Sequence, residues 1–147
     1  MSFRDAIDEA IDRRPDGGRV GVNAGEASAE VDVVRAGPIG VRVRGVRIDR
    51  GRDVDIAEEA NALPDRLRGL PERVRATEVD PRLGGAVLRS RPDEMSEGPN
   101  PEFYQVDLHG KREAEVRRLR AVDGGGYAPV EFDLTRRQLG DLLDQLS

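Results

Sequence analysis

The chain has no cysteine, no tryptophan and one histidine, and only 3% of its 147 residues are aromatic. The absence of cysteine excludes disulfides, thiolate metal sites and a cysteine nucleophile. The lone His109 has no second imidazole with which to share a metal ion, and no serine has the sequence context of a nucleophile elbow. With so few aromatic residues, the core must be built mainly from valine, leucine, isoleucine and alanine.

Long hydrophobic runs are also missing. No stretch approaches the roughly 18–20 apolar residues that a membrane span needs. The opening segment MSFRDAIDEAIDRR lacks the apolar stretch of a signal peptide. We therefore expect a cytoplasmic protein without a membrane anchor, folded as one domain over residues 1–147.

Lysine is almost absent. All but one of the 24 basic residues are arginine, the exception being Lys111, and the net charge is −5. Arginine pairs with carboxylates in a planar, two-pronged geometry that lysine cannot provide. The composition therefore favours ion pairs on the surface, while the overall charge repels nucleic acid phosphate.

Two amphipathic segments in the first half predict helices. The first is capped by Ser2, and the second begins at Asp55, where Glu58 completes a capping box. Proline cannot donate the hydrogen bond that a helix interior requires. We therefore expect the second helix to break at Pro64, which opens a short turn through Leu70.

The closing helix has the clearest start. Thr135 is its N-cap and Gln138 completes a capping box, while Leu134 and Leu139 are spaced as a hydrophobic staple. Leucines at helical spacing give it one apolar side, formed by Leu139, Leu142, Leu143 and Leu146. We expect this side to dock on the chain's own sheet, and the alternative is that it is offered to a partner.

Strands fill most of the remaining sequence. The first meander is predicted at residues 19–23, 27–35 and 39–49. If AGP is a three-residue hairpin loop, Val33 lies opposite Val41 on the buried face, Asp32 opposite Arg42 and Glu30 opposite Arg44 on the other. The arginines of the VRVRGVR stretch would then pair with carboxylates across the strands.

Two changes in the phase of the apolar residues predict β-bulges. One lies beside Gly45 and the other near Arg117–Arg118. Further strands are expected at 73–79, 83–90 and, in a second meander, between 103 and 132, with a mobile polar loop at about 91–102. We predict an α+β fold in which a twisted, mostly antiparallel sheet of roughly six to eight strands, in two meanders, is covered on one face by an N-terminal, a middle and a C-terminal helix.

No motif points to a cofactor or a metal ion. The glycine-rich segment at 17–25 opens no helix that could hold a phosphate. The acidic residues around Asp53 and Asp55 lack the ligand spacing of a calcium loop. We therefore expect neither a cofactor nor a metal ion.

Arginine occupies outward positions of several predicted strands. If they share one face they form a basic platform for nucleic acid or an acidic partner; otherwise they are a solvated face with cross-strand ion pairs. No aromatic pair at alternating strand positions offers base stacking. The candidate residues are Arg42, Arg44, Arg73, Arg75, Arg89, Arg118 and Arg120.

The order of helix, three strands, helix, further strands and helix in a small acidic chain resembles type III secretion chaperones of the effector-binding class. The segment VEFDLTRRQLGDLLDQL is similar to the strand and helix that end COMM domains. Neither resemblance assigns a role to a residue of this chain.

The function we expect is a non-catalytic protein-interaction module, an adaptor or chaperone-like protein, with a protein partner or a second copy of itself. The alternative is a nucleic-acid-associated protein that uses the arginine face. A third reading is a hydrolase with an unrecognised carboxylate site.

Overall fold

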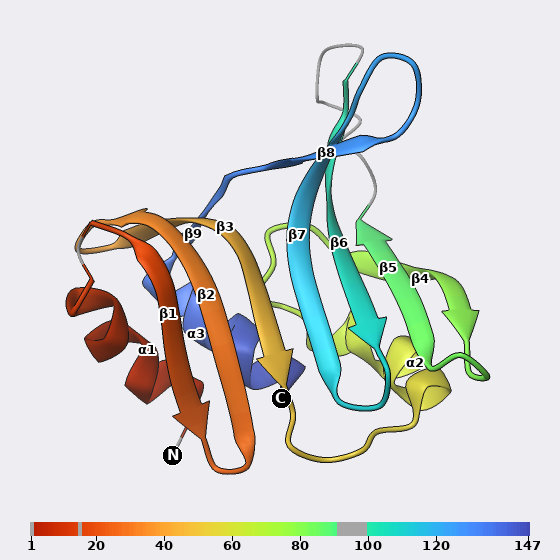
Figure 1. The fold of residues 1–147 in the computed structure, drawn as a ribbon, viewed down its shortest axis with the longest axis horizontal. Coiled ribbons are helices and arrows are strands. Elements are labelled where there is room, and N and C mark those ends of the chain that lie inside the picture. The colour runs from red at the N-terminus through yellow and green to blue at the C-terminus, as the bar shows by residue number, and fades with distance from the viewer. Residues whose placement is uncertain (1, 15, 91–99) are drawn as a thin grey trace.

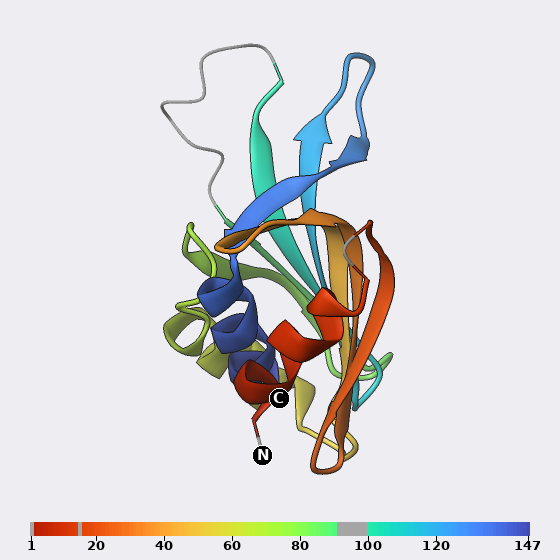
Figure 2. The same cartoon turned by 90° about the vertical axis from the view of Figure 1, so that its left-hand side faces the viewer.

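The strands form one open sheet, and the three helices of the described chain lie on one of its faces (Figures 1 and 2). The computed structural model describes residues 2–14, 16–90 and 100–147. In chain order the elements are α1 (Phe3–Asp12), β1 (Gly18–Ala24), β2 (Ala27–Ala36), β3 (Gly40–Asp49), α2 (Ile56–Arg66), β4 (Val74–Asp80), β5 (Gly85–Ser90), β6 (Glu102–His109), β7 (Glu113–Ala121), β8 (Tyr127–Val130), β9 (Phe132–Thr135) and α3 (Arg136–Leu146). The predicted α+β class with a mostly antiparallel sheet is confirmed. The loop predicted at 91–102 falls largely outside the described residues.

Within the described residues the sheet has nine strands, in the order β1-β2-β3-β7-β6-β5-β4, with β8 paired to β7 and β9 paired to β3. β3 changes partner along its length, because residues 40–43 pair with β9 and residues 46–49 pair with β7. The end of the second predicted meander therefore leads into two four-residue strands, β8 and β9, which have different neighbours.

Local capping signals place the helix starts as predicted. The Ser2 side chain caps α1, and the Asp55 carboxylate accepts from the Glu58 N–H at 3.0 Å at the start of α2. At α3 both halves of the capping box form: the Gln138 N–H donates to Thr135 Oγ1 at 3.0 Å, and the Thr135 N–H donates to Gln138 Oε1 at 2.9 Å. Caps depend on neighbours within one turn, which is why the sequence alone predicts them.

The predicted break at Pro64 is wrong, since α2 continues through Pro64 to Arg66. Pro64 lies in the last turn, so its missing N–H removes only the hydrogen bond to the Ala60 carbonyl. The turn still closes, because the Leu67 N–H donates to the Leu63 carbonyl at 2.8 Å.

The predicted register of β2 and β3 is also wrong. Asp32 lies opposite Gly45, not Arg42, and Glu30 lies opposite Arg47, not Arg44. The bulge beside Gly45 is present, and a second irregularity at Val34 accompanies it. The alternating valines are nevertheless buried, namely Val31 and Val33 of β2 and Val41, Val43 and Val46 of β3, so the pattern predicts the face but not the pairing.

The bulge expected near Arg117–Arg118 is absent from the β6–β7 pair, whose register is continuous. Leu119 is buried instead on the sheet face that points away from the helices, opposite Phe103. Leu119 and Phe103 thus form a small apolar contact on the outer side of the sheet, separate from the main core. This contact explains why the apolar residues of β7 change phase without a bulge.

The main core lies between the sheet and the helices. α1 and α3 pack against each other, and the Asp144 carboxylate of α3 accepts from the Phe3 N–H at 2.7 Å. A carboxylate at this position satisfies an N–H at the start of α1 and complements the helix dipole. Across 2–14, 16–90 and 100–147, no helix has the length and apolar character needed to cross a membrane.

Candidate functional site

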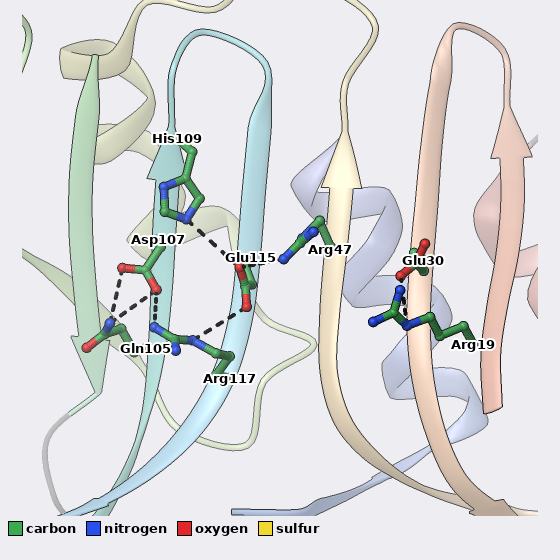
Figure 3. Close-up of polar contacts among 8 residues, drawn as sticks. All are labelled: Arg19, Glu30, Arg47, Gln105, Asp107, His109, Glu115 and Arg117. Atoms are coloured by element: carbon green, nitrogen blue, oxygen red, sulfur yellow. Dashed lines mark hydrogen bonds and ion pairs between the residues drawn. The ribbon is translucent and has the colours of Figure 1, made fainter. Parts of the chain in front are cut away.

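The sheet face opposite the helices, the outer face, carries an array of ion pairs (Figure 3). Successive side chains of a strand point to opposite faces, so every second residue faces outward. The residues drawn are Arg19 from β1, Glu30 from β2, Arg47 from β3, Gln105, Asp107 and His109 from β6, and Glu115 and Arg117 from β7.

Asp107 is the most enclosed carboxylate of this array, with 7% of its surface exposed. It accepts from Arg117 Nη2 at 2.9 Å and from Gln105 Nε2 at 3.1 Å. These donors satisfy the buried charge, as a carboxylate at this depth requires.

Glu115 stands between three cationic or potentially cationic groups. Its carboxylate oxygens lie 3.4 Å from Arg47 Nη2, 3.6 Å from Arg117 Nε and 3.9 Å from His109 Nε2. The Arg117 Nε is buried without a hydrogen-bond partner, because the contact with Glu115 is too long to be one. The carboxylates of the array therefore lie beside arginine side chains.

Two carboxylates outside this array have a lowered pKa. Hydrogen bonds from Arg112 and from Arg42 hold the pKa values of Asp53 and Asp133 below their usual range. A general acid at neutral pH needs the opposite shift. The described residues also contain no group of three or more histidine or carboxylate side chains placed to hold a metal ion.

The candidate arginines do not gather into one platform. Arg42 and Arg44 lie on the outer face, and both pair with acidic neighbours. Arg42 Nε is 2.9 Å from Asp133 Oδ1, and Arg44 lies 3.5 Å from Glu131 and 3.7 Å from Asp32. The charges of Arg42 and Arg44 are therefore paired with carboxylates of the same chain.

Arg118 and Arg120 extend from the other side of β7, the side of the buried Val116. The Arg118 guanidinium lies 4.6 Å from the ring centroid of Tyr104 and donates to Glu72 at 3.1 Å. The sequence predicts Arg118 and Arg120 on the outward face because a bulge at 117–118 would move the following side chains to the opposite face of the sheet.

Arg75 and Arg89 lie opposite each other on β4 and β5. Arg89 donates to Gln105 at 2.8 Å, and its guanidinium carbon is 5.7 Å and 5.2 Å from the ring centroids of Phe103 and Tyr127. The two rings meet edge to face at 5.1 Å. Phe103 lies on β6 and Tyr127 on β8, so the residue pattern of a single strand cannot predict this aromatic pair.

A buried arginine, Arg50, was not predicted as part of any site. Its Nε donates to the Leu146 carbonyl at 2.9 Å, and Nη2 lies 3.7 Å from Glu59, which also pairs with Arg66. Burial, followed by the charges of Arg66 and Arg52, lowers the pKa of Arg50 to about 10. Arg50 thus donates a hydrogen bond to a carbonyl at the C-terminal end of α3, where cations complement the helix dipole.

The apolar side of α3 lies within the core. None of its four leucines has exposed surface, and they pack with side chains from the sheet and from the other helices; they are Leu139, Leu142, Leu143 and Leu146.

A second surface lies between α2 and β4, at the end of the strand order, and we call it the α2–β4 groove. It holds about 800 Å³ and is lined mainly by apolar atoms, including those of Ala57, Ala60, Pro64, Ala76 and Val79. The two β4 residues lie on the core side of the sheet, opposite core residues of β5. Because α2 presents small side chains here, the core ends in an open groove.

Two apolar side chains at this end of the sheet, one of them in the groove, are exposed. Val79 is 43% exposed, and Leu83, in the turn between β4 and β5, is 86% exposed. At the side of the groove Arg73 pairs with Asp65, whereas the exposed Arg75 has no ion pair with a described residue.

Comparison with known proteins gives no match to a family model, a curated protein or a solved structure.

Proposed function

We propose that this chain is a non-catalytic protein-interaction module, adaptor-like or chaperone-like, which binds a partner polypeptide in the α2–β4 groove. The observation that carries the proposal is an open apolar groove beside the edge strand β4. Exposed apolar surface of this kind is typical of docking sites.

Of the two arginines that line the groove, Arg73 pairs with Asp65 and Arg75 has no ion pair with a described residue, while Glu58 lines the α2 side. Arg75 and Arg89 lie opposite each other, and like charges in this position are mutually unfavourable. A partner segment beside β4 that places acidic side chains near Arg75 relieves this repulsion. Its apolar side chains, at alternate positions, then lie over Ala76 and Val79. The occupant we propose is therefore an extended segment that alternates apolar and acidic residues.

A pair of matched variants tests the proposal. Val79→Asp places a charge in the groove, whereas Ile39→Asp places one on an aliphatic residue that is 74% exposed in the loop between β2 and β3. Tagged wild-type and variant proteins are purified from the native host, and their associated proteins are quantified by mass spectrometry. We expect associated proteins that are lost with Val79→Asp and retained with Ile39→Asp, at equal melting temperature. Identical associated proteins in all three samples would contradict the proposal.

One observation favours the nucleic-acid alternative, namely the half-exposed Tyr127 ring beside Arg89 on the outer face. An aromatic ring next to a guanidinium is a surface on which an unpaired base can stack. Single-stranded RNA binding that is lost in Tyr127→Ala would favour this function over the groove. The hydrolase reading has no observation in its favour among the described residues.

A further inference from the structure

The other end of the sheet is an edge with little protection. β1 pairs with β2 along all seven of its residues without a register shift, and no described strand pairs with its other side. Figure 2, which views the molecule from this side, shows β1 with no other element in front of it. Regular exposed edges pair with other strands unless charge, proline or a bulge prevents it.

The edge strand β4 shows what such protection looks like. Its pairing with β5 is interrupted between Ala76 and Glu78, and it carries three charged residues, Arg75, Glu78 and Asp80. β1 has a regular register and a single charged residue, Arg19, which lies 3.7 Å from Glu30 of β2. The contrast indicates that the β1 edge is used for pairing.

We propose that β1 pairs with β1 of a second copy of this chain, in an antiparallel dimer whose two-fold axis passes beside Gly21. Two-fold pairing around this residue places Val20 opposite the partner's Val22 and Arg19 opposite the partner's Asn23. No like charges face each other, and the valines of both strands lie on the core side. The pairing joins the two sheets into one.

Charge on the outer face supports a second copy as the occupant. Asn23, Ser28, Asp49 and Glu113 lie side by side across four neighbouring strands, so this row becomes acidic away from the edge. The partner's Arg19 enters the row beside Asn23. A hollow of about 440 Å³, lined in part by Asn23, Ser28 and Asp49, gives its side chain room to approach the acidic end.

Substitutions at Gly21 test this register, because Gly21 would face its own copy. A Cβ added there has only the Ala29 carbonyl oxygen within reach, at 4.0 Å, so the fold accommodates a side chain. Gly21→Lys and Gly21→Glu each place like charges across the axis. Gly21→Thr is the neutral control, and Val79→Asp is the control for the α2–β4 groove.

The mass in solution is measured by light scattering or sedimentation over a dilution series. We expect the wild type, Gly21→Thr and Val79→Asp to have twice the mass of one chain. For each charged variant alone, the dissociation constant should rise on the order of tenfold or more. An equal mixture of the two should restore dimers, because lysine then faces glutamate.

Other outcomes reject the proposal. A wild type that is monomeric at all concentrations excludes the dimer. Charged variants that remain dimeric, or a neutral control that is monomeric, exclude pairing around Gly21. If the equal mixture of Gly21→Lys and Gly21→Glu stays monomeric, repulsion between facing charges is not the reason that each variant alone loses the dimer. Loss of the dimer in Val79→Asp assigns self-association to the groove.

Discussion

Replacing Leu142 with alanine should lower the free energy of unfolding by about 3–5 kcal/mol. The Leu142 side chain is fully buried, and the substitution removes three of its carbons. At roughly 0.8 kcal/mol for each buried carbon, the lost transfer free energy is about 2.4 kcal/mol. The rest comes from the cavity. Gly69 already touches α3, where an added Cβ would lie 2.8 Å from the Leu142 nitrogen, so this side of the helix cannot move closer to fill the space.

Thermal and urea denaturation measure this loss. For a domain of this size the melting temperature should fall by about 6–20 °C. Leu83→Ala is the matched control, because the same atoms are removed from a side chain that is 86% exposed. That variant should stay within about 0.5 kcal/mol of wild type. An unchanged midpoint for Leu142→Ala, together with loss of an oligomer or a partner complex, would show that α3 is an interaction surface.

Three further results are expected. Gly69→Ala should cost about 1–3 kcal/mol in urea denaturation, because its Cβ would collide with the backbone of α3, whereas Gly37→Ala, with 3.9 Å to its nearest neighbour, should be nearly neutral. The stabilising contribution of Asp133, whose pKa is lowered by Arg42, is present above pH 3.8 and is lost as the pH falls through the lowered pKa; the difference in melting temperature between wild type and Asp133→Asn should shrink over that range. Nucleic acid binding by fluorescence anisotropy should be weaker than micromolar near physiological salt, and binding that survives high salt would contradict this.

The sequence predicts best what neighbouring residues decide. Ser2, Asp55 and Thr135 cap their helices as expected, because each cap is satisfied within one turn. The buried faces of the strands are equally clear from alternating valines.

Pairing between strands depends on contacts that are distant in sequence. The predicted partners of Asp32 and Glu30 in β3 are both wrong. Arg42 instead bonds to Asp133, which β9 brings alongside β3 from 91 residues further along the chain. The residues near Arg42 in the sequence do not predict that β9 pairs with β3.

Residues at the ends of the core are also hard to predict. Arg50 reads as a polar residue after a strand, yet it is buried because the carbonyls at the end of α3 need a donor there. Val79 reads as an ordinary strand valine, and only the small residues of α2 leave it exposed in the α2–β4 groove. Both outcomes depend on which elements become neighbours.

Photo-crosslinking in the native host tests the proposed docking site most directly. A benzophenone amino acid is placed at Val79, in the groove, and in a separate variant at Ile39, outside it. If the α2–β4 groove holds a partner segment, the Val79 position forms a discrete crosslink to another polypeptide and the Ile39 position does not. Absence of a crosslink at Val79, or the same crosslinks from both positions, would contradict the proposed function.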